Sequence, residues 1–173
     1  MAAPKSPHPP DPDPDASEPT DLDDVVDARL ENGDFSNERF LKSSLRRVEL
    51  HLCRLTGIEL AEAAWSDVVL TDCRGDYAGF RNAKLERVVF RDCRLEEADF
   101  GGAALTDVVF ARCELRRASF AGCRNERLQL AGCNLGELVG VEALRGARMP
   151  FADILENGPL FAQALGIQPL PEE

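Results

Sequence analysis

The 173-residue sequence lacks any apolar run near the roughly 20 residues that a membrane-spanning helix needs. Its first residues, MAAPKSPHPPDP, also lack the apolar stretch of a secretory signal peptide. We therefore expect no membrane association and a cytoplasmic location. In that compartment the six cysteines are expected to stay reduced.

Histidine is scarce as well, and this bears on catalysis. The chain has two histidines, His8 near the N-terminus and His51, and the sequence places no constellation of acid, base or nucleophile around either. The nearest cysteines are ten positions apart, whereas metal sites draw ligands from short spacings such as Cys-x-x-Cys. We expect no enzyme, no metal site and no cofactor.

The net charge of −11 is absent from the middle of the chain. Residues 1–28 hold eight acidic residues and one basic residue, residues 29–149 hold nineteen of each, and residues 150–173 hold four acidic residues and no basic one. A DNA mimic needs a sustained negative surface, and a nucleic-acid binder needs a basic face. Because the middle is neutral, we expect no direct binding of nucleic acid.

What the sequence does contain is a period of five. From Phe35 to Leu135 every fifth residue is large and apolar at 19 of 21 positions, with Gly75 and Asn125 as the exceptions. An ideal helix repeats at 3.6 residues and a strand at two, so neither explains the period. A unit of five cannot bury itself, and the repeat therefore predicts a solenoid of stacked units.

A second and longer period sets the size of one coil, because cysteine recurs at every twentieth position. If four units make one coil, equivalent side chains of successive coils lie above one another at about 4.8 Å. This predicts interior ladders of like side chains, in which thiols pack as small apolar groups. It also predicts an outer edge where charges alternate and attract, at Asp67, Arg87, Asp107 and Arg127. The cysteines with this spacing are Cys53, Cys73, Cys93, Cys113 and Cys133.

The units CRLEE, ADFGG, AALTD, CELRR and ASFAG resemble the A-[DN]-[LF]-x-x pattern of the pentapeptide repeat family, over about residues 33–149. The resemblance implies an all-β solenoid, a right-handed quadrilateral β-helix, here of about five coils. The family includes DNA-mimicking proteins that protect DNA gyrase from quinolones, alongside many proteins of unknown role. The resemblance is therefore more specific for fold than for function.

The two ends of the chain have sequence patterns that differ from the five-residue repeat. Residues 1–19 carry seven of the eleven prolines and are predicted to be a disordered tail. Residues 20–32, with Thr20 as a possible N-cap and Gly33 as a stop, predict a short N-terminal capping helix. The period of five shifts by one position after Leu135. Residues 150–173 predict a C-terminal capping helix and tail.

Two surfaces are candidates for interaction. Just before the large residue, one side of the column is apolar at Val69, Val89 and Val109, which fits either a contact face or the β-propensity of valine. The second surface is the C-terminal helix at Leu160, Phe161 and Leu165. Gly75 and Asn125 mark either local irregularities of the column or a binding site, and Tyr77 is placed to fold over the gap at Gly75.

These observations favour a non-enzymatic protein that acts as a rigid interaction or scaffold module. Its partner would be another protein or a second copy of itself. The alternative is a DNA-mimic type of modulator or protector of a type II topoisomerase, DNA gyrase, in which the acidic N-terminal tail supplies the negative charge that the column lacks.

Overall fold

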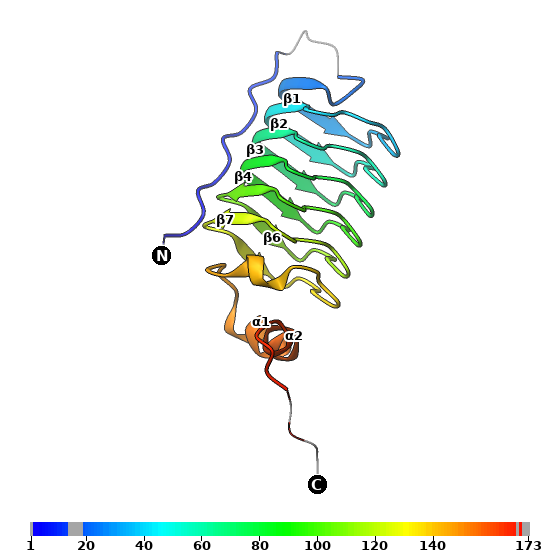
Figure 1. Ribbon diagram of the computed structural model, residues 1–173. Coiled ribbons are helices and arrows are strands. Elements are labelled where there is room, and N and C mark those ends of the chain that lie inside the picture. Colours follow the sequence, from blue (N-terminus) through cyan, green and yellow to red (C-terminus); the bar gives the residue numbers. More distant parts are fainter. Residues whose placement is uncertain (1, 14–18, 169, 171–173) are drawn as a thin grey trace.

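The computed structural model describes residues 2–13, 19–168 and 170. The chain forms a column of stacked coils, with two short helices beyond the last coil (Figure 1). About six coils stack between the first strand, which begins at Asp24, and a single 3-10 turn, η1 (Val141–Leu144). The column is the all-β solenoid that the repeat predicts.

Every strand pairing in the column is parallel and joins equivalent residues of successive coils, such as Val25 with Leu45 and Leu50 with Leu70. Four longer strands come first and are followed by four shorter ones, which occupy the same two sides of later coils. The long strands are β1 (Asp24–Glu31), β2 (Ser44–His51), β3 (Ala64–Thr71) and β4 (Lys84–Arg91). The short strands are β5 (Ala104–Thr106), β6 (Val109–Ala111), β7 (Arg124–Glu126) and β8 (Gln129–Ala131).

The corners of the coils explain the period of five. Every fifth residue from Asp27 to Glu137 has a positive φ, between 52° and 63° where the residue is not glycine. A left-handed residue turns the chain, and four such turns, one in each repeat unit, close a four-sided coil. Asparagine and glycine at several of these positions, such as Asn82 and Gly102, were a sequence signal for the corners.

The large apolar residues fill the inside of the column. Phe80, Phe90, Phe100, Phe110 and Phe120 are fully buried. Rings one coil apart stack with centroids 4.8–5.0 Å apart, and rings half a coil apart meet edge to face. Both arrangements are favoured by the quadrupoles of the aromatic rings. The column therefore has one continuous aromatic core.

The two exceptions to the period are accommodated inside the column. A Cβ atom added to Gly75 would lie 3.0 Å from Leu95 Cδ2, so Leu95 occupies that space. Tyr77 is 59% exposed, and the expectation that it covers the gap is wrong. Asn125 Nδ2 donates hydrogen bonds to the carbonyl oxygens of Ala143 (2.6 Å) and Arg145 (3.2 Å), as expected for a polar residue facing main chain.

The N-terminal helix predicted for residues 20–32 is wrong, because this segment contains strand β1. Val25 and Leu30 continue the period of five upstream of Phe35, and Ala28 takes the small position. A helix of about a dozen residues is marginal by itself, whereas β1 gains a full ladder of hydrogen bonds to β2. The column thus begins at residue 24 and not at residue 33.

The predicted disorder of residues 1–19 is also wrong where the structure describes this segment. Residues 2–13 run as extended chain beside the column, past β1, β2, β3 and β4 (Figure 1). Residues 1 and 14–18 lie outside the described part of the chain. Hydrogen bonds to one corner of the column hold the described segment in place.

At the other end, the predicted shift by one position after Leu135 is present. Gln129 pairs with Arg148, whereas the strict repeat of the earlier coils would pair it with Met149. Pro150 then precedes two helices in place of the single one expected, α1 (Phe151–Glu156) and α2 (Gly158–Ala164), which are separated at Asn157. Neither helix has a fully buried residue.

Candidate interaction surfaces

One corner of the column carries a ladder of alternating charge, which we call the corner ladder. Each aspartate in it accepts two hydrogen bonds from the arginine of the next coil. In the pair of Asp67 and Arg87 the two distances are 2.6 and 2.8 Å, and the pair of Asp107 and Arg127 has the same values. The alternation predicted from sequence is confirmed. The complete ladder is Asp27, Arg47, Asp67, Arg87, Asp107 and Arg127.

The carboxylates of the corner ladder are held in the charged form. Hydrogen bonds from the Arg127 guanidinium lower the pKa of Asp107 to about 2, against the opposing effect of burial. Hydrogen bonds from Arg87 hold the pKa of Asp67 well below its usual range. The relative exposures of these aspartates are only 6% for Asp67 and 2% for Asp107. Charges this buried are stable only when paired.

The valine face predicted from sequence is stacked but largely covered. Val69, Val89 and Val109 occupy the same position in successive coils. The same position is Glu49 in the preceding coil and Gln129 in the following coil. Val89 is only 9% exposed, and the other two valines are half-buried. The face therefore offers little apolar area to a partner.

The three residues predicted on the C-terminal helix differ in burial. Leu160 and Phe161 are half-buried and pack against the core of the column, whereas Leu165 is 72% exposed. Two further apolar residues of this region, which the sequence placed at helical spacing but not among the interface candidates, are strongly exposed. Phe151 and Leu155, both on α1, are 74% and 64% exposed. Their spacing of four, directly after Pro150, was the signal for one apolar helix face.

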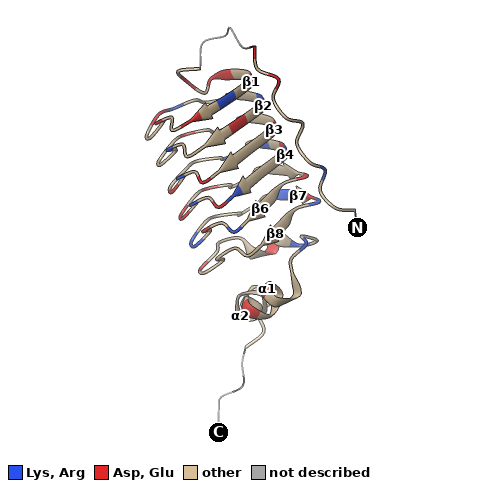
Figure 2. Cartoon of the chain, turned by 180° about the vertical axis from the view of Figure 1, so that it is seen from behind, with Lys and Arg blue, Asp and Glu red and all other residues tan. Residues whose placement is uncertain are grey.

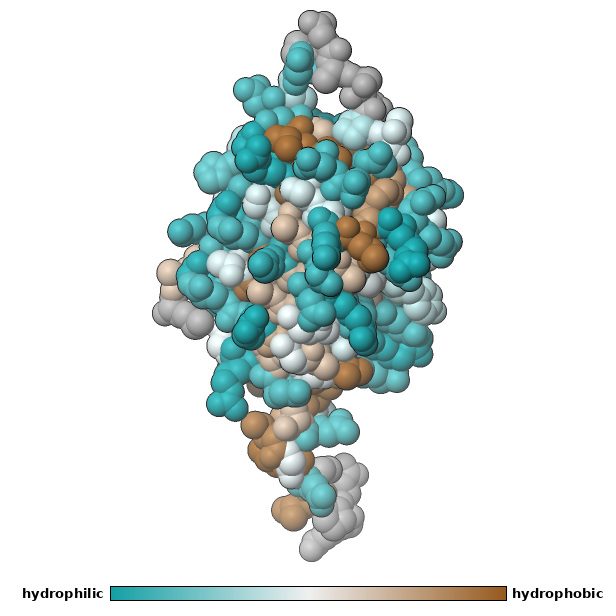
Figure 3. All heavy atoms as spheres, turned by 45° about the horizontal axis from the view of Figure 1, so that its top comes forward, coloured by the Kyte–Doolittle hydropathy of each residue, from teal (hydrophilic) through white to brown (hydrophobic). Residues whose placement is uncertain are grey.

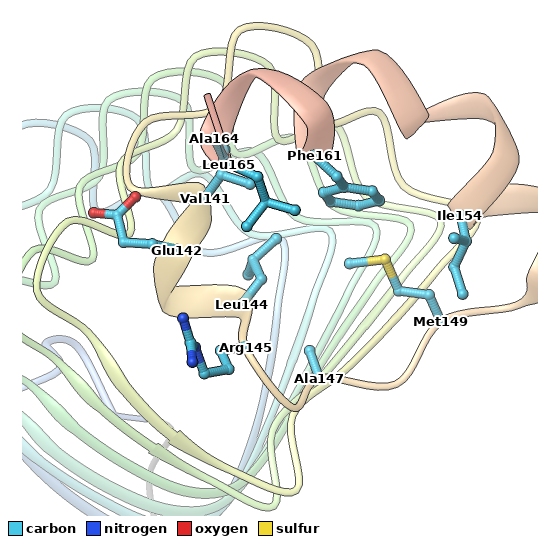
Figure 4. Close-up of a pocket in the computed structure, with 10 residues that line it drawn as sticks. All are labelled: Val141, Glu142, Leu144, Arg145, Ala147, Met149, Ile154, Phe161, Ala164 and Leu165. Carbon is cyan, nitrogen blue, oxygen red and sulfur yellow. The ribbon is translucent and has the colours of Figure 1, made fainter. Parts of the chain in front are cut away.

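Between the last coil and the helices lies an apolar hollow of about 550 Å³. Phe161 of α2 and Leu165, directly after α2, line one wall, and Leu144 of η1 and Met149 line the other (Figure 4). In the space-filling view, apolar side chains gather at this end of the molecule, while polar side chains cover most of the visible face of the column (Figure 3). The C-terminal end combines a hollow with protruding apolar side chains.

The thiols line the inside of the column as the longer period predicts. The Sγ atoms of Cys53, Cys73, Cys93 and Cys113 each lie 3.4–3.7 Å from a main-chain oxygen of the preceding coil. All six cysteines are free. Burial raises the pKa of the Cys123 thiol to about 11, which disfavours the reactive thiolate.

Metal-binding and membrane-spanning features are absent from the described residues, 2–13, 19–168 and 170. Within these ranges no group of three or more His, Cys, Asp or Glu side chains has a geometry that could hold a metal ion. His51 lies 4.0 Å from Asp72 on the surface. None of the described helices has the length and apolar character to cross a membrane.

Stacked four-sided coils with a left-handed residue at every corner define a parallel β-helix built from five-residue units, whose candidate sites lie on its outer surfaces. A sequence model described as "Pentapeptide repeat region" matches residues 24–100 and 43–120. The chain belongs to the pentapeptide repeat family. No curated protein matches the sequence.

The chain is similar to solved structures of pentapeptide repeat proteins. A trypsin-treated form of QnrB1, a plasmid-mediated fluoroquinolone resistance protein, is 19% identical, with a TM-score of 0.46 over 83% of this chain and 92% of that one. HetL, involved in heterocyst differentiation regulation in the cyanobacterium Nostoc sp. strain PCC 7120, is 22% identical, with a TM-score of 0.46 over 74% of this chain and 66% of that one. A pentapeptide repeat protein of the Arabidopsis thaliana thylakoid lumen is 16% identical, with a TM-score of 0.32 over 74% and 72%.

Proposed function

We propose that this protein is a non-enzymatic scaffold of the cytoplasm, a rigid column that assembles with a second copy of itself through its C-terminal helices. The observation that carries the proposal is the exposed apolar face of α1, with Phe151 at 74% and Leu155 at 64% exposure. Large side chains exposed together on a short helix mark an interaction surface, because they gain about 25 cal/mol for each Å² removed from water.

A second copy of the chain suits this surface because the apolar hollow and the protruding side chains of Phe151 and Leu155 lie at the same end of one chain. A twofold axis places the same patch of both subunits against each other, so that Phe151 or Leu155 of one copy faces the hollow beside Phe161 of the other. The column keeps the two patches rigid, which lowers the entropy lost on assembly. The valine face at Val69, Val89 and Val109 is a weaker candidate, since it is mostly covered.

The test is the molar mass of the full chain in solution, measured by sedimentation from low to high micromolar concentration. We expect a dimer that the double variant Phe151→Asp and Leu155→Asp converts to a monomer. Leu52→Asp is the matched control, because Leu52 is 45% exposed at a corner of the column and far from the helices. A wild-type chain that stays monomeric throughout the range would refute this mode of assembly.

The valine face has its own variants in the same experiment. Val69→Asp and Val109→Asp place charges on the two half-buried members of the face and leave the more buried Val89 in place. If assembly takes place through the helices, the dimer survives both substitutions. Loss of the dimer in these folded variants, with no effect of the α1 substitutions, would reassign the interface to the valine face.

Modulation of DNA gyrase by charge mimicry is the alternative. Lysine and arginine are interspersed with acidic residues along the column (Figure 2), and acidic corner residues such as Asp92 pair with an arginine one coil away, here Arg112. This pairing weakens any sustained negative row and favours the scaffold. A gyrase supercoiling assay with and without a quinolone tests the alternative, and inhibition or protection at low micromolar protein would support it.

A further inference from the structure

The proline-rich N-terminal segment is bound to the corner ladder through its main chain. The N–H groups of Lys5, His8 and Asp11 donate hydrogen bonds to aspartates of the ladder, at 2.9, 2.9 and 3.3 Å. The segment runs antiparallel to the stacking direction of the coils, with its N-terminus beside the later coils (Figure 1). The acceptors are Asp107, Asp67 and Asp27 respectively, and each uses its Oδ1 atom.

In these hydrogen bonds the three-residue spacing of the donors matches a two-coil spacing of the acceptors. Each step of three along the N-terminal segment moves the contact by two coils of the column. One turn of a polyproline II helix takes three residues and rises about 9.3 Å. Two coils rise about 9.6 Å at the usual spacing of neighbouring strands. A polyproline II peptide therefore stays in register with every second coil.

The charge alternation of the ladder has the same step of two coils. Because aspartate and arginine alternate, a carboxylate faces the peptide in every second coil, and the arginine of the next coil holds it with two hydrogen bonds. The remaining acceptor capacity of the carboxylate is directed to the peptide N–H. Asp67 Oδ1 also lies 2.8 Å from the Nδ1 atom of His8. The acceptors are thus fixed before a peptide binds.

From Pro4 to Asp11 the burial of the segment follows the period of three as well. Pro4 and Pro7 are half-buried and Pro10 is buried, whereas Lys5 and His8 are exposed. Within residues 4–11 each buried or half-buried proline directly precedes a residue whose N–H is used, whereas Pro12, which is also half-buried, lies beyond these contacts. Proline itself has no N–H to offer. The segment therefore presents one proline face to the column and one donor for each turn. This spacing defines a Pro-x-x repeat as the ligand.

We propose that the corner ladder is a binding site for proline-rich peptides in the polyproline II conformation, with the chain's own residues 4–11 as its resident ligand. The column recognises the three-residue spacing of the peptide and the N–H group that follows each inward-facing proline. The resident segment occupies the site in cis, and a peptide with the same Pro-x-x step competes for it in trans. This site is on the side of the column and does not depend on the C-terminal helices.

The first test is amide hydrogen exchange of the full chain, followed residue by residue by NMR. We expect exchange at Lys5, His8 and Asp11 to be at least about tenfold slower than at Ser6, which lies exposed between two of them. Equal exchange at all four amides would overturn the proposal, because the segment would then not be held at the ladder.

Two insertion variants test the register itself. One glycine inserted between Ser6 and Pro7 carries Lys5 about 3 Å past Asp107, so that its protection falls while His8 and Asp11 stay protected. One glycine inserted between Ala3 and Pro4 is the matched control, since it leaves all three spacings unchanged. Identical amide exchange at Lys5 in the two variants would show that the column does not recognise the three-residue spacing of the segment.

The second test is binding in trans. A fluorescent peptide with the sequence of residues 2–13 is titrated into the full chain and into its triple variant Pro4→Gly, Pro7→Gly and Pro10→Gly. We expect at least about tenfold tighter binding to the variant, whose weakened resident segment competes less at its high effective concentration. A control peptide with alanine for every proline should bind about tenfold more weakly, and equal binding of both peptides would overturn the proposal.

Discussion

Phe90 stacks on Phe110 of the next coil with ring centroids 4.8 Å apart and an angle of 7° between the ring planes. The separation equals the usual spacing between neighbouring strands, so the side chains repeat with the same step as the backbone. Phe100 contacts Phe90 edge to face from another side of the coil, at 6.1 Å and 83°. Phe90 is thus held by one stacked ring, Phe110, and by the edge-to-face rings of Phe80 and Phe100.

This packing predicts a large loss of stability for the substitution Phe90→Ala. The free energy of unfolding should fall by about 3–5 kcal/mol, because the rings around the cavity are fixed by their own coils and cannot collapse into it. Urea unfolding measures the change. Tyr77→Ala is the control, since Tyr77 is 59% exposed and its removal should cost no more than about 0.5 kcal/mol. Similar losses for the two variants would contradict a tightly packed aromatic core.

The left-handed corners predict opposite effects of glycine at two exposed leucines. Leu52 sits at a corner with φ of 55°, so Leu52→Gly should raise the free energy of unfolding by about 0.5–1 kcal/mol by relieving strain. Leu41 is as exposed but does not have a positive φ, so Leu41→Gly should lower it by about 0.5–1 kcal/mol. Thermal unfolding distinguishes the two, and a loss of stability in both variants would argue against strain at the corners.

The corner ladder predicts a loss of stability in acid. Folding lowers the pKa of Asp107 from its usual 3.8 to about 2, chiefly through the hydrogen bonds from Arg127. A lowered pKa stabilises the folded state above the pKa of the unfolded chain, and this contribution is lost as the pH falls from about 4 to about 2. Asp107→Asn should flatten the pH dependence of the unfolding free energy in this window. An unchanged slope would mean that the pair of Asp107 and Arg127 does not form.

The interior position of the thiols predicts slow chemical modification. A thiol reagent at pH 8 should label the native protein slowly and all six cysteines quickly after denaturation, because only the thiolate reacts. The half-buried Cys123 and Cys133 should be the first to react in the native state. Mass spectrometry of peptides identifies the labelled sites. Rapid labelling of Cys73 or Cys93 in the native protein would place these side chains outside the column.

The repeat explains how far the sequence predicted the structure. In a solenoid each unit contacts copies of itself, so the period of five and the longer period of one coil already define the core, the coil and the pairing of Asp67 with Arg87. The repeat also begins earlier in the chain than predicted, at β1. Val25, Ala28 and Leu30 obeyed the period, but their spacing also suited a helix, and only the hydrogen bonds to β2 decide between the two.

The contacts that occur only once could not be predicted from the sequence. The positions of Phe151 and Leu155 depend on how α1 leaves the last coil, and no other unit repeats that geometry. The place of the proline-rich segment depends on a match between its step of three and a step of two coils, which exists only when the column is assembled. The sequence by itself determined the repeating column, because its information is local and repeated. Tertiary structure alone decided what lies against the column, because those contacts join segments that share no period.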